Sequence, residues 1–365
     1  MIQVPLPKEY AELDIAACDE RIEAAKAALG SRLVILGHHY QRDEVIRHAD
    51  FRGDSYKLAK DANIRPDAEF IVFCGVHFMA ESTDILTPDH IKVILPNLAA
   101  GCSMADMANI FQVRKAWQEI DKVLGTSATV IPVTYINSAA NLKAFVGEKG
   151  GTVCTSTNAP TAVEWALNQG DKMLFFPDQH LGRNTGIRLG YDPETEMILW
   201  DPFKPLGGNT EEDIKRAKFI LWKGHCSVHK RFSVEQIAAA RAQHPDVTVV
   251  VHPECPMDVV EASDLFGSTE FILKTVEAAP AGSTWAIGTE INLVNRLAKE
   301  NPDKTIFCLD PQICPCSTMY RIHPTFLLWA LENLVAGNVV NQIIVPPKVK
   351  HFAKVALDRM LTVCA

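Results

Sequence analysis

The feature that most constrains this chain is a pattern of four steps that occurs three times. Each copy begins with a short β-branched run ending in polar residues, continues through a small hydroxyl-rich turn and two further strand-like runs, and ends in Cys-Ser. The first runs are 34–36, 130–135 and 247–251, and the final cysteines are Cys102, Cys226 and Cys316. Short apolar runs of this kind are typical of buried parallel strands. The pattern predicts three similar α/β units, and the alternative is one doubly wound sheet with coincidental cysteine placement.

The spacing of the copies supports this division. From residues 34, 133 and 249, the distance to the final cysteine is 68, 93 and 67 residues. The extra length of the middle copy lies at 187–213, which is rich in proline and glycine and is predicted to be an added surface excursion. The predicted units are 1–110, 111–230 and 231–319, with the C-terminal helices of 320–365 packed on the first unit.

Composition narrows the class of protein. The chain has 365 residues, of which 47% are hydrophobic, and a formal net charge of -8. This excludes general disorder and is ample for two or three packed cores. An acidic balance without a basic tract argues against a nucleic-acid partner. No window approaches the ~18 uncharged apolar residues of a membrane span, and the first residues lack a secretory signal pattern. We therefore expect no membrane partner and a cytoplasmic location.

The ten cysteines are the most informative residues. In a reducing compartment they are core residues, metal ligands or catalytic groups rather than disulfides. If the ends of three equivalent units converge, Cys102, Cys226 and Cys316 would suit a 4Fe–4S cluster with one open iron, which could act as a Lewis acid. The alternative is that they are small core hydrophobes. Cys314 could instead be the third ligand or pair with Cys316 in a disulfide, although the Cys-Ser repetition favours Cys316.

Polar side chains follow the predicted first strands, at the edge where open α/β sheets bind ligands. Histidine and glutamate can transfer protons near neutral pH, and tyrosine can donate to a developing oxyanion; the alternative is that these groups are structural. The residues concerned are His38, His39, Tyr40, Tyr135, Asn137, His252 and Glu254. The segment 178–183 also ends a strand and is equally consistent with a functional or a salt-bridged turn. Basic residues around Cys226, among them His229, would attract an anionic substrate.

The hydroxyl-rich turns offer a second kind of site. If helices begin there, their hydroxyls could hold a carboxylate or a phosphate, or they could simply cap the helices. The residues are Ser55, Ser156, Ser268 and Thr269.

In their order along the chain, these segments resemble those of the quinolinate synthase family from about residue 33 to 361. The matching motifs are Gly37-His38-His39-Tyr40-Gln41, Gly53-Asp54-Ser55, Tyr135-Ile136-Asn137, Thr155-Ser156-Thr157-Asn158-Ala159, Pro177-Asp178-Gln179-His180-Leu181-Gly182, His252-Pro253-Glu254-Cys255 and Gly267-Ser268-Thr269. The resemblance implies three αβα units around a pseudo-threefold axis, with the cluster and the active site at the centre. It also implies an enzyme of de novo NAD biosynthesis, a transferase that condenses iminoaspartate with dihydroxyacetone phosphate to quinolinate, releasing phosphate and two waters.

The resemblance also implies roles for individual residues. Cys102, Cys226 and Cys316 would hold one 4Fe–4S cluster. The implied catalytic residues are His38, Tyr40, His252 and Glu254. The implied substrate-binding residues are His38, Ser55, Tyr135, Asn137, Ser156, His252, Glu254, Ser268 and Thr269. The insertion at 187–213 and the second thiol at Cys314 depart from shorter members of the family.

Three rival interpretations remain open at this point. The chain could be a non-catalytic iron–sulfur redox sensor, for which the Cys314–Cys316 pair is the best support. It could be an iron–sulfur hydro-lyase of another pathway, or an α/β enzyme without a cluster. The expected partners are the two small substrates and, transiently, an aspartate-oxidising enzyme that supplies the unstable imine.

Overall fold

A computed structural model describes residues 3–61, 65–312 and 315–363 of the chain. Its strands form three small sheets. In order across the sheet, the first contains β14 (Gln342–Ile343), β4 (Lys92–Ile94), β3 (Phe70–Cys74), β1 (Leu33–His38) and β2 (Phe51–Gly53). The second contains β6 (Thr152–Cys154), β5 (Val130–Tyr135), β7 (Lys172–Phe176), β9 (Phe219–Trp222) and β8 (Met197–Trp200). The third contains β11 (Leu265–Phe266), β10 (Thr248–Val251), β12 (Thr284–Gly288) and β13 (Thr305–Cys308). The predicted α/β class with small parallel sheets is confirmed.

The three sheets share one strand order. When β8, which belongs to the insertion, is left aside, the first strand of each sheet along the chain has the second on one side and the third on the other, and the fourth lies beyond the third. All of these pairings are parallel; β14 adds an antiparallel strand to the first sheet, and β8 adds a parallel one to the second. A shared order of this kind is what three copies of one supersecondary unit produce.

The repeat extends to single hydrogen bonds. In the first and third sheets, an aspartate just before the second strand accepts the N–H of the first: Asp50 from Ile35 at 2.8 Å and Asp264 from Val249 at 2.7 Å. In the second sheet the register places Pro132 at this point, and proline has no N–H to donate. The residue before β6 is a glycine, whose missing side chain leaves room for the Pro132 carbonyl.

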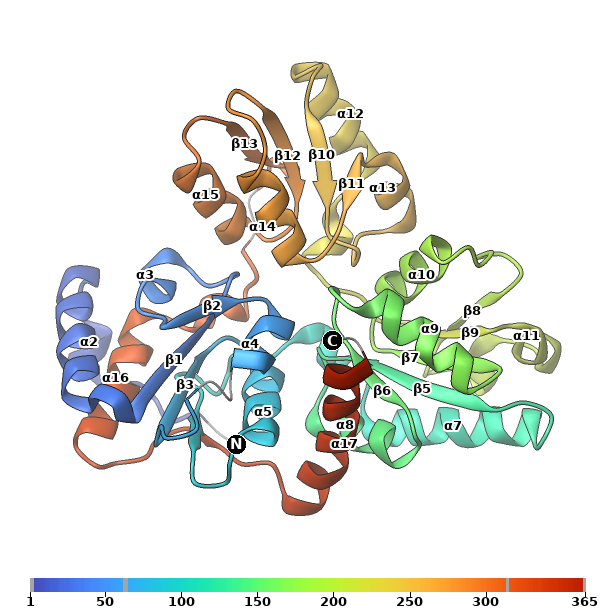
Figure 1. Cartoon of the computed structure of the whole chain (residues 1–365), viewed down its shortest axis with the longest axis horizontal. Helices are drawn as coiled ribbons and strands as arrows, with labels where there is room; N and C mark the ends of the chain where they lie inside the picture. The colour runs from blue at the N-terminus through green and yellow to red at the C-terminus, as the bar shows by residue number, and fades with distance from the viewer. Residues whose placement is uncertain (1–2, 62–64, 313–314, 364–365) are drawn as a thin grey trace. The chain divides into compact units, whose positions relative to one another are not determined.

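The chain divides into two compact units. Unit 1 comprises Met1–Cys102, Glu290–Arg296 and Ile313–Pro346, and unit 2 comprises Ser103–Thr289, Leu297–Gln312 and Pro347–Ala365. Unit 1 holds the first sheet, with α2 and α3 toward one face and α4 and α5 toward the other (Figure 1). Its helical elements are α1 (Lys8–Ala11), α2 (Ile15–Leu29), η1 (Gly30–Arg32), α3 (Asp43–Ile46), α4 (Ser55–Asp61), α5 (His77–Leu86), η4 (Met319–Arg321) and α16 (Pro324–Val335).

Unit 2 holds the other two sheets. Around the second sheet, α9 and α10 contact each other and α7 contacts α8. The helical elements here are α6 (Ser103–Asp106), α7 (Ile110–Leu124), α8 (Ala140–Glu148), α9 (Ala159–Gln169), α10 (Gln179–Arg188), η2 (Pro205–Gly208) and α11 (Glu211–Arg216). Around the third sheet they are η3 (His229–Arg231), α12 (Val234–Gln243), α13 (Met257–Ala262) and α14 (Thr269–Glu277), and α15 (Ile291–Glu300) runs through both units. Apolar side chains of β10 pack with α12 and α13 in one core cluster.

Local sequence explains several helix boundaries. α12 begins with a complete capping box between Ser233 and Gln236. α2 and α7 each have 15 residues and end at a glycine with φ of 54°, Gly30 and Gly125. A residue in this left-handed region is strained unless it is glycine, so these two glycines stop the helices that precede the first strands of the first and second sheets.

The two C-terminal helices pack on different sheets. α16 lies against α2, as expected, whereas α17 (Pro347–Val363) packs on α8 and β6 rather than on the first unit. Close approach explains the difference, because a side chain at Gly147 of α8 would collide with the Phe352 carbonyl of α17. The sequence could not show which helix carries the glycine that α17 needs.

The insertion at 187–213 is more than the predicted surface excursion. It contains β8, which extends the second sheet beyond β9, and Trp200 of that strand is buried. Another part of the insertion remains at the surface, where Phe203 is 84% exposed. The insertion therefore enlarges the sheet at the edge beyond its fourth strand.

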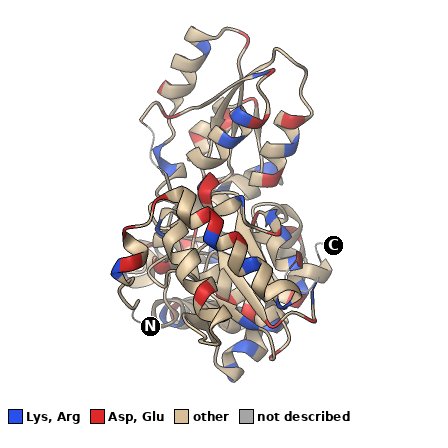
Figure 2. Cartoon of the chain, turned by 90° about the vertical axis from the view of Figure 1, so that its left-hand side faces the viewer, with Lys and Arg blue, Asp and Glu red and all other residues tan. Residues whose placement is uncertain are grey.

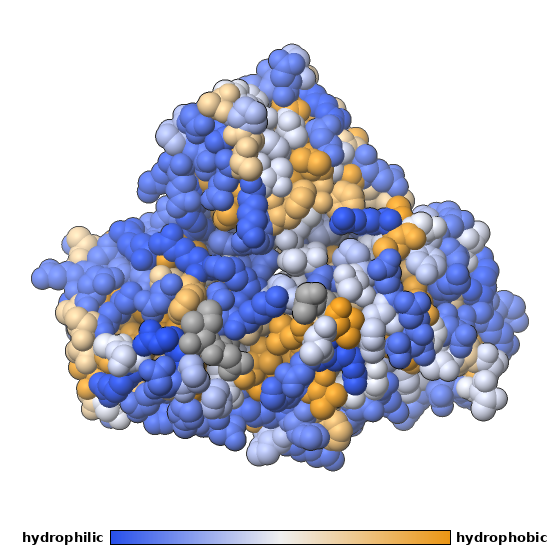
Figure 3. Space-filling model, in the orientation of Figure 1, coloured by the Kyte–Doolittle hydropathy of each residue, from blue (hydrophilic) through white to orange (hydrophobic). Residues whose placement is uncertain are grey.

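The surface is largely hydrophilic and carries both acidic and basic residues (Figure 2, Figure 3). Acidic and basic residues are interspersed over the helices in Figure 2, and apolar residues form scattered groups on a largely hydrophilic face in Figure 3. Among the described residues, no helix combines the length and apolar character required to cross a membrane.

Candidate functional site

The three recurrent cysteines each open the same structural module. Six residues after the cysteine comes a buried apolar residue, seven after it the N-cap of a helix, and eight after it the first helical residue. The caps of α7, α12 and α16 are Asn109, Ser233 and His323, and each side chain accepts a backbone N–H of its helix. The cysteines thus occupy equivalent positions at the level of secondary structure.

The turns after Cys226 and Cys316 are especially alike. The N–H of Lys230 donates to the Cys226 carbonyl at 3.0 Å, and that of Tyr320 donates to the Cys316 carbonyl at 2.9 Å. A short 3-10 helix follows in both, η3 after Cys226 and η4 after Cys316.

Burial separates the cysteines into two groups. Cys18, Cys74, Cys154 and Cys255 are buried, whereas Cys102, Cys226, Cys316 and Cys308 are partly exposed. Burial raises the pKa of Cys74 to about 12 and that of Cys255 well above its usual range, so these two stay thiols, which are poor metal ligands. All three recurrent cysteines belong to the accessible group, and Cys314 lies outside the described residues.

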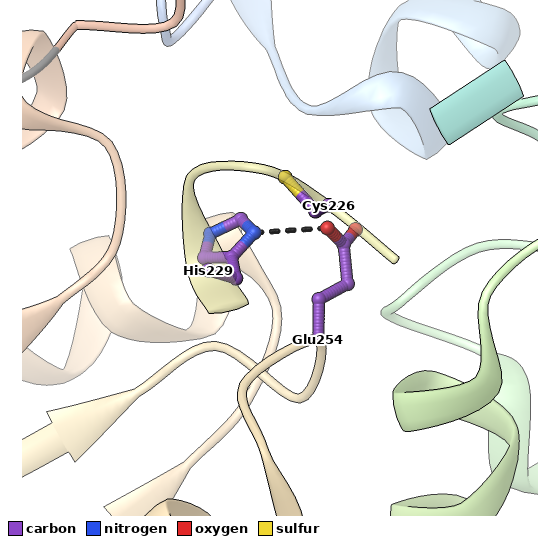
Figure 4. Close-up of side chains that lie close together, drawn as sticks. All are labelled: Cys226, His229 and Glu254. Carbon is purple, nitrogen blue, oxygen red and sulfur yellow. Dashed lines mark hydrogen bonds and ion pairs between the residues drawn. The ribbon is translucent and has the colours of Figure 1, made fainter. Parts of the chain in front are cut away.

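Glu254 is the centre of a buried polar cluster in unit 2 (Figure 4). One carboxylate oxygen accepts the Tyr135 hydroxyl at 2.5 Å and the other accepts His229 Nδ1 at 2.8 Å. Burial alone would raise the pKa of Glu254, but the two neighbouring histidines and these hydrogen bonds lower it to about 2. Because an ionised carboxylate can only accept, His229 carries its proton on Nδ1, and Nε2 faces Thr289 Oγ1 at 3.1 Å.

His252 lies beside this cluster and stays neutral. Its ring stacks on that of His229 with centroids 4.3 Å apart. Burial, and then the charge of His229, lower the pKa of His252 to about 3. Its Nδ1 accepts the N–H of Glu254 at 3.3 Å, so a neutral ring has its proton on Nε2.

Three groups of this region could hold a metal ion together. Cys226 Sγ, a nitrogen of His229 and a carboxylate oxygen of Glu254 all lie within 4.8 Å of one another. Figure 4 shows the three side chains turned toward a common point from the Cys226 turn and the end of β10. Thiolate, imidazole and carboxylate are common ligands of transition metals. The structure therefore brings a predicted cluster ligand together with a predicted catalytic carboxylate.

Asp178, the N-cap of α10, and Asn184 within that helix both interact with Glu254 or its segment. The Asp178 carboxylate accepts the N–H groups of His180 and Leu181 at 2.7 and 3.1 Å. These two hydrogen bonds lower the pKa of Asp178, but burial, and after it the charge of Glu254, raise it well above its usual range. Asn184 of α10 donates to the carbonyls of Pro253 and Cys255 at 2.9 Å each, and so binds the residues on both sides of Glu254.

His38 and Tyr40 follow β1 in unit 1 with a closely related local geometry. The N–H of Tyr40 donates to His38 Nδ1 at 3.1 Å, as that of Glu254 does to His252. The rings of His38 and Tyr40 meet edge to face with centroids 4.7 Å apart. His38 is buried and Tyr40 is partly exposed, so the phenol is the more accessible group of the pair.

Asn137 follows β5, two residues after Tyr135. Its amide oxygen is buried and accepts no hydrogen bond within the described residues. An unpaired buried oxygen is costly to a folded protein and points to a ligand or an ordered water.

The predicted hydroxyl residues all lie at helix starts. Ser55 is the first residue of α4, Ser156 lies in the turn before α9, and Thr269 is the first residue of α14. The Ser268 hydroxyl caps α14 by accepting the N–H of Phe271 at 3.3 Å. Capping, the simpler alternative, is therefore realised at Ser268, whose hydroxyl hydrogen can still be donated.

The basic residues around Cys226 are not a simple positive patch. His229 is hydrogen-bonded to Glu254, and Arg231 forms an ion pair with Asp310 at 3.0 Å. Burial lowers the pKa of His225. Electrostatic attraction of an anion by this group is therefore weaker than the sequence suggests.

Sequence reasoning missed His229 as a member of the acid–base cluster, and Asn184 as a support of Glu254. The repeat marks the position of His229, which follows Cys226 by three residues as Met319 follows Cys316 in the third copy. Nothing in the sequence indicated that Asn184 would reach the segment 253–255.

Comparisons with known proteins show the family of the chain. The family model described as Quinolinate synthetase A protein matches residues 20–362. The chain is 62% identical over 361 residues to the quinolinate synthase of Corynebacterium glutamicum, covering 99% of this chain and 91% of the relative. It is 58% identical over 358 residues to that of Herpetosiphon aurantiacus, covering 98% and 95%, and 56% identical over 365 residues to that of a Nocardioides species, covering 98% and 92%.

Proposed function

Because this chain belongs to the quinolinate synthetase A family, we propose that it is a quinolinate synthase of NAD biosynthesis. We propose that it condenses iminoaspartate with dihydroxyacetone phosphate to quinolinate, with release of phosphate and two waters. The observation that carries the proposal is the buried cluster of Glu254, Tyr135 and His229 beside Cys226. It combines proton-transfer groups with a metal-binding thiol in one place.

We propose that Cys102, Cys226 and Cys316 hold one 4Fe–4S cluster. The chemistry of the donor set fits, since all three are accessible thiols at equivalent points of a repeated module, whereas four other cysteines are buried. When bound, such a cluster supplies an open iron that polarises substrate oxygen. This proposal includes a division into three units at 1–110, 111–230 and 231–319, for which the common strand order is the support; their arrangement around a pseudo-threefold axis is implied by the family resemblance alone.

The side chains of the chain supply the proton transfers. Glu254 is ionised at neutral pH because its pKa is about 2, and it is the proposed acceptor of the proton that the triose loses during its keto–aldo isomerisation. Tyr135 and His229 donate to the Glu254 carboxylate and hold it in place. The accessible phenol of Tyr40 and the Nε2–H of His38 and His252 are donors to substrate oxygen.

Other residues would bind and orient the substrates. The unpaired oxygen of Asn137 is suited to accept an N–H or O–H of the growing chain. Ser55, Ser156, Ser268 and Thr269, at helix starts, can donate hydroxyls to carboxylate or phosphate. An aspartate-oxidising enzyme is the proposed transient source of the imine, and the proposed location of the chain is the cytoplasm.

Anaerobic turnover tests the proposal directly. Iminoaspartate and dihydroxyacetone phosphate are supplied to protein of known iron and sulfide content, and quinolinate and phosphate are measured. Folded protein without iron, or iron-loaded protein that forms no quinolinate, would contradict it. The second result is the one expected of a non-catalytic redox sensor.

Glu254→Gln tests the acid–base role within that assay. Loss of a positioned general base costs about 100-fold or more in turnover, while the iron content stays that of the wild type. Glu261→Gln, an exposed glutamate of the nearby α13, is the matched control. Full turnover by the Glu254 variant with full iron content would show that the assignment is wrong.

A further inference from the structure

A buried carboxylate at the start of α15 contacts the turn of a predicted cluster ligand. Glu290 is fully buried, and its Oε1 accepts the N–H of Cys316 at 3.1 Å. The same carboxylate accepts the backbone N–H of Asn292 at 2.8 Å and its side-chain amide at 2.9 Å. Burial of a carboxylate is costly and is compensated only by such bonds. Glu290 and the Cys316 turn therefore hold each other in place.

Asn292 continues the connection to the other predicted site segment of unit 1. Its side-chain amide also donates to the Tyr40 carbonyl at 3.3 Å. One turn further along α15, Arg296 is buried and donates to the carbonyls of His39 and Gln41, the latter at 3.2 Å. The start of α15 therefore holds the backbone on both sides of Tyr40.

The two segments also contact each other directly. The Gln41 amide donates to the Met319 carbonyl at 3.2 Å, and Arg42 donates to the Tyr320 carbonyl at 2.8 Å. The Arg42 guanidinium lies over the Tyr320 ring, 3.5 Å from its centroid. The segment after β1 and the turn after Cys316 thus form one hydrogen-bonded assembly.

We propose that Glu290 is a positioning residue that fixes the Cys316 turn and, through Asn292, the Tyr40 segment in one frame. The inference rests on the proposed function, in which Cys316 is a cluster ligand and Tyr40 a catalytic residue. Neither Glu290 nor Asn292 is assigned a contact with substrate. Outer partners that orient a metal ligand typically change metal affinity or activity by 10–100-fold when they are removed.

The two residues should behave differently when they are substituted. Glu290→Ala removes the bond to Cys316 and also the support of Asn292, so we expect cluster loss to a chelator to be about 10-fold faster and kcat to fall by about 10-fold. Asn292→Ala leaves the bond between Glu290 and Cys316 in place. It should lower kcat by about 10-fold while chelator-induced cluster loss stays at the wild-type rate. Glu290→Gln keeps one acceptor oxygen and should partly rescue cluster retention.

The matched control is Glu332→Ala. Glu332 is a partly buried carboxylate of the same unit whose partners are Tyr10 and Arg21, and its loss should lower stability without changing cluster retention or kcat per folded molecule. The experiment uses the full chain, reconstituted anaerobically with iron and sulfide. The readouts are the thermal midpoint, iron content, the rate of bleaching by a chelator, kcat and KM.

Each outcome bears on one claim. Faster cluster loss in Glu290→Ala, with normal retention in Asn292→Ala and Glu332→Ala, supports the proposal. If the wild-type chain takes up the cluster and is active, a wild-type rate of cluster loss in Glu290→Ala overturns the positioning role alone. Effects in all three variants that follow the folded fraction overturn it too. A wild-type chain that takes up no iron overturns the proposed function, and the inference with it.

Discussion

The turns that follow Cys226 and Cys316 have the same backbone but different chemistry. Both run from the cysteine through a 3-10 helix to a capped α-helix, with matching hydrogen bonds. Three residues after the cysteine they diverge. His229 binds the Glu254 carboxylate, whereas the carbonyl and sulfur of Met319 face the Gln41 amide at 3.2 and 3.5 Å.

The difference separates what a repeat preserves from what it leaves free. The backbone module positions a thiol, and each copy keeps that thiol. The side chain at the third position is free to vary, and one copy uses it for an acid–base contact while another uses it for packing between segments. Equivalent folds can therefore carry unequal chemistry, because function depends on the site residues rather than on the fold.

Loss of a recurrent thiol is the change with the largest expected effect. Cys226→Ser and Cys316→Ser should each lose bound iron and lower turnover by more than about 100-fold, since each removes one proposed ligand. Cys308→Ser is the control, because Cys308 is also partly exposed but lies outside the repeated module. Iron analysis and quinolinate assays measure both effects. Wild-type iron content in either ligand variant would break the equivalence of the two turns.

Exchange of the third residue tests the divergence itself. His229→Met gives the second turn the residue of the third, and we expect turnover to fall by about 100-fold, because Glu254 loses a hydrogen-bond donor. Met319→Leu conserves volume and should change the free energy of unfolding by less than about 1.5 kcal/mol, with turnover unchanged. Turnover is compared at matched iron content. Equal effects of the two substitutions would mean that the turns do not differ in function.

The helix after the Cys316 turn is anchored by a titratable contact. Glu332 of α16 accepts two bonds from Arg21, at 2.8 and 2.7 Å, and one from Tyr10 at 2.7 Å. Burial alone would raise the pKa of Glu332, but the bonds from Arg21 and Tyr10 lower it overall. Glu332→Gln should cost about 2 kcal/mol at pH 7.

The pH dependence of that cost has a definite sign. The stability that ionised Glu332 contributes is complete above its unfolded pKa, near 4.5, and is lost as the pH falls through its lower folded pKa. The difference in unfolding free energy between wild type and Glu332→Gln should therefore be constant from pH 8 to about 5.5 and shrink below about 4.5. Denaturant titrations at several pH values measure it. A cost that grows toward acid pH would contradict the assignment.

The caps of the repeated modules should give the smallest effects. Ser233→Ala and Asn109→Ala each remove a side chain that accepts a backbone N–H of α12 or α7, and each should cost about 1 kcal/mol. Gln243→Ala, exposed in the last turn of α12, should change stability by less than about 0.5 kcal/mol. Similar costs at Ser233 and Asn109 in urea unfolding would sharpen the equivalence of the modules. A large inequality would show that their helices depend on different packing.

Much of the fold could be predicted because its signals are local. The strand predicted at 130–135 occurs with those bounds, and the runs predicted at 34–36 and 247–251 correspond to the buried strands β1 and β10. Continuous apolar runs and capping residues determine these elements without help from distant parts of the chain. The short edge strands β2, β6 and β11 were not predicted, because two or three residues carry no readable periodicity. The same holds for β8, whose pairing with β9 depends on tertiary contact.

By itself, the sequence determined that this is an α/β protein built from a repeated unit, with three thiols in register and polar groups at the strand ends. These properties follow from hydrophobic periodicity and spacing, which are written along the chain. Tertiary structure alone decided which polar groups meet: Tyr135 and His229 at Glu254, and Glu290 at Cys316. Partners that lie 119, 25 and 26 residues apart are brought together only when the sheets and turns pack, and hydrogen bonds of this kind leave no periodic pattern in the sequence.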